Sequence, residues 1–293
     1  MAKVLGIGNA TLDIIHVVDR YPDENDEVRC RKRFVRRGGN ATNTLVVLSQ
    51  LGVACCWAGV TVNNPDGQFI LGDLQRHGID TGPCRLMETG SVPVSSVLLS
   101  SSTGSRSIIH YRDLPEYTFQ DFACIALHPF DWLHFEGRNV AETRRILERL
   151  QRDSVSIPCS VEIEKPRDGI EALFGYADVL MFSREYGLAR GFTEPLSLLA
   201  AIRKRYPEAD LFCTWGDAGA AAIDHRGHVF ENAAFPPAAI VDTLGAGDTF
   251  NAAIISGYLD GLDIRATLAG ACRLAGEKCG QHGFDGLGHA GGS

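Results

Sequence analysis

Apolar and polar positions alternate in short blocks along most of the chain, and the blocks change their period in a regular way. After about residue 131, short apolar runs typical of buried strands are separated by stretches with an apolar residue every three or four positions. The strands predicted there are Trp132–Glu136, Val155–Glu162, Val179–Phe182 and Leu211–Thr214, and the helices are Val140–Arg152, Gly169–Phe174 and Pro195–Tyr206. Such alternation predicts an α/β fold, a mostly parallel central sheet with helices on both faces.

The first part of the chain mixes this pattern with extra β structure. A strand at Val4–Gly8, a helix after residue 40, a strand at Val53–Val60 and a helix at Pro65–His77 fit the same core. Two segments have little helical pattern and instead predict a small β layer over the sheet edge: residues 13–37, and residues 91–113 with a polar hairpin turn. We therefore assign residues 1–12, 38–90 and 114–293 to the core, and the two β segments to a separate layer.

The segment before the first helix is rich in basic residues. Six of the nine residues in Arg29–Arg37 are Arg or Lys, while Val28, Cys30 and Phe34 alternate among them. This pattern predicts a strand with a solvated basic face and an apolar face opposite.

Composition narrows the class of protein. The chain has 293 residues, 45% of them hydrophobic, and a net charge of −8, which argues against a nucleic-acid partner. No apolar run reaches the roughly 18 residues needed to span a membrane, and the N-terminus lacks the pattern of a signal peptide. The nine cysteines form no Cys-x-x-Cys pair, so we expect reduced thiols in a cytoplasmic protein. We expect the glycine-rich end, Gly286–Ser293, to be disordered.

The most informative stretch is Val241–Phe250. Gly245, Ala246 and Gly247 have little or no side chain, so their N–H groups can approach an anion, and the helix expected from Thr249 adds partial positive charge. Asp248 places a carboxylate in that anion site, which makes sense if it accepts a proton from a hydroxyl that attacks a phosphate. A plain helix N-terminus with an acid in its first turn is the alternative interpretation.

A second cluster suits a ligand with vicinal hydroxyls. Gly39 permits close approach of the backbone, Asn40 is expected to cap the next helix, and Asn43 follows one turn later on the same side. Asp13 follows the first strand, at the end where α/β sheets bind ligands, although a turn or surface Asp fits as well.

Other candidates are less specific. The loop of Gly216, Asp217, Ala218 and Gly219 follows a strand and is either a simple turn or part of a binding site. Glu162 and Glu164 share a strand face, so they could approach a cation or form a surface ion pair. Gly6-Ile-Gly8 lacks the third glycine of a dinucleotide fingerprint, there is no Walker motif, and no histidine spacing indicates a metal site.

The run Asp242-Thr-Leu-Gly-Ala-Gly-Asp248 and the run Gly38-Gly-Asn40 resemble the two signatures of the ribokinase-like (PfkB) carbohydrate kinases. The resemblance implies a ribokinase-like fold with a β lid over the sugar site, and it implies ATP and Mg²⁺, with K⁺ as an activator near Asp242. It assigns Asp248 as catalytic base and Gly245–Gly247 as anion hole. It further implies that the sugar is bound by Asp13, Gly39, Asn40, Asn43 and Asp248, and the nucleotide by Arg106, Gly216, Asp217, Ala218 and Gly219.

Further stretches resemble the ketohexokinase branch of that family, namely Arg36–Ala41, Phe135–Asn139, Val161–Arg167, Ala234–Pro237 and Gly283–Gly286. This branch implies phosphorylation of fructose on its 1-hydroxyl and a homodimer in which two lids clasp each other. Phosphorylation of ribose or adenosine, and a non-catalytic sugar or nucleotide sensor, are the alternatives. Many relatives carry Asn-x-x-Glu where this chain has Ser183-Arg-Glu-Tyr186, so the magnesium ligands stay unassigned, with Glu164 or Glu185 as candidates.

Overall fold

The structure, a computed structural model, describes residues 1–288. Its core is an eight-stranded sheet with strand order β14-β13-β12-β11-β10-β9-β1-β4. The six strands from β4 to β12 are mutually parallel, and only β13 and β14 pair antiparallel. The strands are β1 (Lys3–Ile7), β4 (Ala54–Ala58), β9 (Trp132–Glu136), β10 (Cys159–Ile163), β11 (Val179–Phe182), β12 (Asp210–Thr214), β13 (Ala220–Ile223) and β14 (Val229–Asn232).

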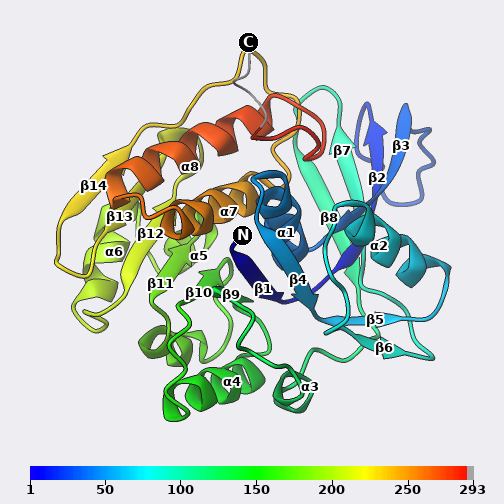
Figure 1. Cartoon of the computed structure of the whole chain (residues 1–293). Coiled ribbons are helices and arrows are strands. Elements are labelled where there is room, and N and C mark those ends of the chain that lie inside the picture. Colours follow the sequence, from blue (N-terminus) through cyan, green and yellow to red (C-terminus); the bar gives the residue numbers. More distant parts are fainter. Residues whose placement is uncertain (289–293) are drawn as a thin grey trace.

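Helices cover both faces of this sheet, which is why its central strands β9, β10 and β11 are buried at every position. Helices α1, α7 and α8 pack against one another on one face, whereas α3 and α4 lie on the other (Figure 1). The predicted mostly parallel α/β sheet is therefore confirmed. The helices are α1 (Asn40–Gln50), α2 (Pro65–Arg76), α3 (Phe119–Ala123), α4 (Val140–Arg152), α5 (Arg184–Ala189), α6 (Pro195–Arg203), α7 (Ala246–Leu259) and α8 (Ile264–Cys279), with 3₁₀ segments η1 (Ile170–Tyr176) and η2 (Gly216–Ala218).

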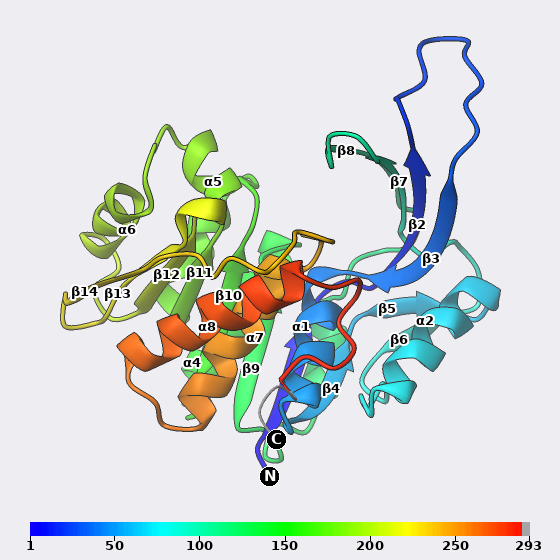
Figure 2. The same ribbon diagram turned by 90° about the horizontal axis from the view of Figure 1, so that it is seen from above.

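A separate four-stranded sheet, called the lid sheet below, has the order β3-β2-β7-β8. Figure 2 shows its β2–β3 arm projecting away from the core. Its strands are β2 (Thr11–Val18), β3 (Lys32–Gly38), β7 (Val94–Ser100) and β8 (Arg106–Tyr111), and a short parallel pair, β5 (Val60–Val62) and β6 (Arg85–Met87), lies beside the core. A small sheet apart from the main one was predicted and is present.

The basic segment differs from its prediction. Strand β3 begins only at Lys32, so Val28 and Cys30 lie outside it and form no apolar strand face with Phe34. The basic residues do not all lie on a solvated face either, because the Arg37 side chain is only 2% exposed. The alternation of residue types could not reveal this, because the acid that pairs with Arg37 comes from α2, 36 residues later.

Other boundaries shift by a few residues. Strand β10 starts at Cys159 instead of Val155, and the segment after Gly169 is a 3₁₀ helix that runs to Tyr176. Leu287 is buried at 3% exposure, so the expected disorder from Gly286 is wrong there, and residues 289–293 lie outside the described part. Within residues 1–288, no helix is both long enough and apolar enough to cross a bilayer.

Candidate active site

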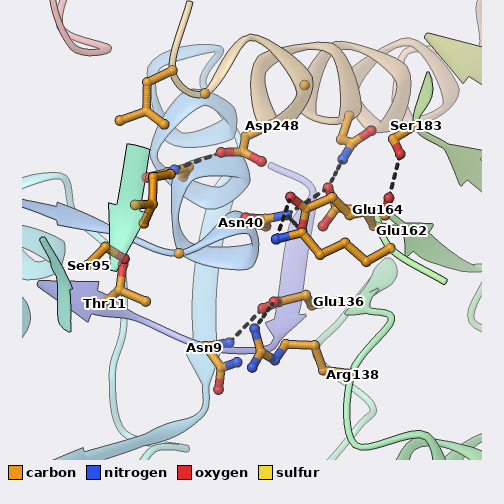
Figure 3. A pocket seen from close by; sticks show the side chains of 18 of the residues that line it. Asn9, Thr11, Asn40, Ser95, Glu136, Arg138, Glu162, Glu164, Ser183 and Asp248 are labelled. Atoms are coloured by element: carbon orange, nitrogen blue, oxygen red, sulfur yellow. Dashed lines mark hydrogen bonds and ion pairs between the residues drawn. The ribbon is translucent and has the colours of Figure 1, made fainter. Parts of the chain in front are cut away.

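A cavity of about 570 Å³ lies between the lid sheet and the carboxyl ends of the central strands. The lid contributes Thr11, Asp13, Ser95, Arg106 and His110, and the core contributes strand ends together with the first turns of α1 and α7. Figure 3 shows Asp248 on one side of the site, the carboxylates of Glu162 and Glu164 beside Asn40, and Glu136 with Arg138 below them. The two sequence signatures, about 200 residues apart, thus meet in one cavity.

The start of α7 is built for close contact with a ligand. Its N-cap is Gly245, whose φ of +83° favours glycine, and a Cβ there would lie 2.3 Å from the Phe284 ring. Gly245 and Gly247 line the cavity, whereas Ala246 does not, and the Ala246 N–H donates to the Thr243 carbonyl at 3.3 Å. The helix expected from Thr249 therefore begins three residues earlier, at Ala246, and its positive end lies at the cavity.

Asp248 lies in the first turn of α7 and is buried, with 7% of its surface exposed. Its Oδ2 accepts a hydrogen bond of 2.7 Å from Nδ2 of Asn43 on α1. Burial raises the pKa of Asp248 to about 8, the Asn43 hydrogen bond lowers it, and the carboxylates of Glu164 and Glu136 raise it. A carboxyl with a pKa close to neutral is suited to accept and return a proton.

The turn into α1 differs from the prediction in one respect. Gly39, not Asn40, is the N-cap of α1, with a φ of +104°, and Asn40 is the first helical residue. A Cβ on Gly39 would lie 2.2 Å from the Asn9 carbonyl oxygen, so only glycine fits. Because it is not used for capping, the Asn40 amide donates to Glu162 and Glu164, at 3.2 Å in each case.

Asp13 lies across the cavity on the lid side, at 8% exposure. Its Oδ1 accepts a 2.8 Å hydrogen bond from the Thr11 hydroxyl. Burial raises the pKa of Asp13, and hydrogen bonds from Thr11 and Ser95 lower it. Asp13, Gly39, Asn40 and Asn43, proposed from separate stretches, therefore all line the cavity that holds Asp248.

The acidic residues at the strand ends form a group that the sequence indicated only in part. Glu162 accepts from Asn40 and Asn251 through Oε1, but its buried Oε2 has no hydrogen-bond partner among the described residues. Burial raises the pKa of Glu162 well above its usual value, and the nearby Asp248 carboxylate raises it further. Burial likewise raises the pKa of Glu136.

The free Oε2 of Glu162 and the partly exposed Glu164 carboxylate fit a hard cation. No group of three or more His, Cys, Asp or Glu side chains within residues 1–288 is arranged to hold a metal. Mg²⁺ in phosphoryl-transfer sites commonly takes one or two carboxylates and completes its shell with water and phosphate oxygens, so the two side chains are sufficient. Glu185, the other candidate, does not line the cavity.

The oxygens of Asp242, near which K⁺ was expected, contact cationic side chains of the protein itself. The buried Lys278 ammonium donates to the Asp242 carbonyl at 2.7 Å and lies 3.3 Å from its Oδ2. Arg36 contacts the same Oδ2 at 3.3 Å. An activating K⁺ near Asp242 therefore stays a prediction.

Only one of the residues predicted to bind the nucleotide outside the Gly245–Gly247 run lines the cavity. Arg106, at the start of β8, lines the cavity, and its side chain is exposed. The loop Gly216–Gly219 does not line it, although Thr214, at the end of the strand before that loop, does. The role of this loop therefore stays a prediction.

Sequence reasoning missed several cavity residues: Asn9, Thr11, Ser95, His110, Glu136 and Arg138. Glu136 and Glu162 could have been found together, because each lies at the carboxyl end of a parallel strand, the rule that singled out Asp13. The lid residues have no comparable signal, because their approach to the site depends on how β2 pairs with β7.

Comparison with known proteins agrees with this geometry. Residues 1–286 match the model of the pfkB family carbohydrate kinases. The chain is 38% identical to ketohexokinase from Mus musculus, over 97% of this chain and 98% of that protein. It is 25% identical to ribokinase from Bacillus subtilis, over 94% of this chain and 92% of that protein.

Solved structures share the fold at lower identity. Ribokinase from Arabidopsis thaliana, complexed with ribose and ATP, superposes with a TM-score of 0.79 at 20% identity, covering 97% of this chain and 94% of that one. Ribokinase from Giardia lamblia gives a TM-score of 0.81 at 14% identity, covering 97% and 96%. Together with the family match, the signatures and the cavity, these findings show that the chain belongs to the PfkB family and is an ATP-dependent sugar kinase.

Proposed function

We propose that the protein transfers the γ-phosphoryl group of ATP to the 1-hydroxyl of a ketohexose, with D-fructose as the preferred acceptor. The single observation that carries the chemistry is the buried carboxylate of Asp248 in the first turn of α7, beside Gly245 and Gly247. The ketohexose is favoured by the 38% identity to a ketohexokinase over nearly the whole chain. Relatives that are ribokinases and nucleoside kinases keep ribose and nucleosides as the alternative acceptors.

In the proposed mechanism the sugar lies between the two signatures. Asp13, Asn40 and the backbone at Gly39 bind its hydroxyls, because carboxylates and amides together offer both acceptors and donors. Asn43 holds Asp248 by its 2.7 Å hydrogen bond. Asp248 then accepts the proton of the attacking hydroxyl as the oxygen bonds to the γ-phosphorus and the bond to the ADP oxygen breaks.

Charge on the transferred group is balanced by the protein. The N–H groups of Gly245 and Gly247, together with the positive end of α7, would face the developing negative charge. Arg106, which extends from the lid sheet into the cavity, is proposed to contact the phosphates. Glu162 and Glu164 would hold Mg²⁺, which would neutralise the polyphosphate of ATP.

The proposal includes a homodimer formed through the lid sheets. Strand β8 is an edge strand and leaves Ile108, Ile109 and Tyr111 exposed at 50%, 70% and 56%. Exposed apolar edge strands favour association with another chain. Light scattering should give a dimer mass, and Ile109→Lys should shift it toward the monomer; a monomeric wild type at micromolar concentration would contradict the dimer.

We further propose a cytoplasmic location, on the basis of nine cysteines that the structure leaves as free thiols. The function itself is tested by measuring ATP consumption with Mg²⁺ and fructose, ribose, glucose or adenosine. Turnover that is fastest with fructose and is lost in Asp248→Asn supports the proposal. Turnover only with another acceptor would keep the mechanism and reject the ketohexose. ATP binding without any turnover would indicate a sensor.

A further inference from the structure

One buried charge next to the site has no role in the mechanism above. Arg37, at the end of β3, is buried together with its partners Thr42 and Asn43, whereas its partner Asp73 is partly exposed. Its Nε donates to Asp73 Oδ2 on α2 at 2.7 Å, and its Nη1 donates to Asn43 Oδ1 at 2.7 Å and to Thr42 Oγ1 at 2.9 Å. Burial of a charged guanidinium costs free energy of desolvation even when the group is hydrogen-bonded, so a functional role for Arg37 is worth testing.

The contact with Asn43 fixes the orientation of that amide. A guanidinium only donates hydrogen bonds, so the carbonyl oxygen of Asn43 must face Arg37. The amide nitrogen of Asn43 then faces Asp248 and donates to its Oδ2 at 2.7 Å. If the amide turned over, its oxygen would face the Asp248 carboxylate and repel it.

The contact with Thr42 supports the turn that precedes α1. The Thr42 hydroxyl accepts from Arg37, and its oxygen lies 2.9 Å from the Gly38 carbonyl and 3.0 Å from the Gly39 carbonyl, to which it donates. Arg37 is thus linked both to the expected sugar-binding turn and to the hydrogen bond on the proposed base.

The charges around the base give Arg37 a second effect. Glu162, Glu164 and Glu136 are acidic groups near Asp248, and Arg37 is a cation whose charge lowers the pKa of Asp248. Arg37 itself faces Asp73 from α2, Asp13 from β2 and Asp248 from α7. Removal of its charge would therefore make ionisation of Asp248 less favourable.

We propose, on the basis of the proposed function, that Arg37 is a positioning residue for catalysis. It holds the Asn43 amide so that it donates to Asp248, and Asp73 holds Arg37 in turn. The chain of contacts runs from α2 through β3 and α1 to the first turn of α7, and Arg37 itself does not line the cavity.

The test compares Arg37→Gln, Arg37→Lys and Asp73→Asn with the wild type. Arg144→Gln, which removes an arginine with an exposed side chain on α4, is the matched control. For each folded protein, kcat, KM for ATP and sugar, and the pH dependence of kcat are measured. We expect Arg37→Gln to lower kcat about 10- to 100-fold and leave KM for ATP nearly unchanged, because the base is misplaced and not the nucleotide.

The pH profile separates positioning from simple stability. Arg37→Gln should move the acid limb of kcat upward by about one pH unit, because a cation near Asp248 is lost. Asp73→Asn should move it in the opposite direction, because Arg37 keeps its charge and loses its counter-charge. Arg37→Lys should keep the limb in place and still lower kcat about 10-fold, since an ammonium cannot reproduce the planar contacts.

Several outcomes would overturn the proposal. Wild-type kcat and acid limb in Arg37→Gln, or lower stability without any movement of the limb, would assign Arg37 a structural role only. If Arg37→Gln does not fold, a wild-type kcat in Arg37→Lys together with an unmoved acid limb in Asp73→Asn would likewise assign Arg37 a structural role. Failure of the proposed function is recognised separately, by turnover that persists in Asp248→Asn.

Discussion

The carboxylate proposed as the catalytic base should also make the folded protein less stable as the pH rises. Burial raises the pKa of Asp248 to about 8, from an ordinary value of 3.8. Below about pH 4, the carboxyl group is protonated in both the folded and the unfolded chain, so its titration does not lower the free energy of unfolding. Between about pH 4 and pH 8, the unfolded chain loses the proton and the folded chain keeps it, so the free energy of unfolding falls.

Asp248→Asn removes this titration and keeps the shape and the hydrogen bond from Asn43. A difference of about four pKa units corresponds to an upper bound of about 5 kcal/mol. Proton sharing with Glu162 and entry of water reduce that figure, so we expect the variant to be about 1 to 3 kcal/mol more stable at pH 9. The gap should close as the pH is lowered to 4 and stay constant above pH 9.

Urea unfolding of wild type and Asp248→Asn at pH 5, 6, 7, 8 and 9 measures this gap. Asp168→Asn, a change at an exposed carboxyl, serves as the control and should give no gap at any pH. A variant that is less stable than the wild type at pH 9, or a gap that does not change with pH, would show that Asp248 is not held protonated by burial.

Three further predictions concern the same site. The rate of turnover should rise with pH through an inflection near pH 8, because Asp248 acts as a base only when ionised; a rate that falls over this range would contradict that role. Gly39→Ala should lower the free energy of unfolding by about 1 to 3 kcal/mol and weaken sugar binding, because the backbone φ is +104° and the new Cβ would meet the Asn9 carbonyl. Urea unfolding and a sugar titration measure the two effects, and wild-type values in both would contradict the prediction. Lys278→Met should lower the free energy of unfolding, measured in urea, by about 3 kcal/mol, because the partly buried Asp242 carboxylate loses the Lys278 ammonium. An unchanged free energy of unfolding would show that Arg36 alone is sufficient to stabilise that carboxylate.

Much of the architecture could be predicted because its signals are local. Strands β9 and β11 and helix α4 have the bounds that the apolar pattern predicted, whereas α7 starts at Ala246, three residues before the expected Thr249. Burial in α4 repeats with the helical period, whereas β9 and β11 are short runs buried at every position; in both cases neighbouring residues carry the information.

The sequence was less informative where a residue's role depends on a distant partner. Asparagine is a common N-cap residue, so Asn40 was expected to cap α1. Gly39 occupies the N-cap position instead, because the backbone there passes close to Asn9. Arg37 is one of six basic residues in its segment, and only the packing of α2 reveals that it is buried on Asp73. Glu136 and Glu162 become one acidic group only when β9 and β10 pair in register, which no short-range pattern specifies.

The central claim is that Asp248 is the base of a kinase that acts on fructose. ATP consumption by the purified protein with Mg²⁺ and fructose, compared with Asp248→Asn under the same conditions, tests it most directly. We predict turnover by the wild type and a loss of about 10²- to 10⁴-fold in the variant, with the fold intact. Turnover in Asp248→Asn close to that of the wild type would contradict the claim.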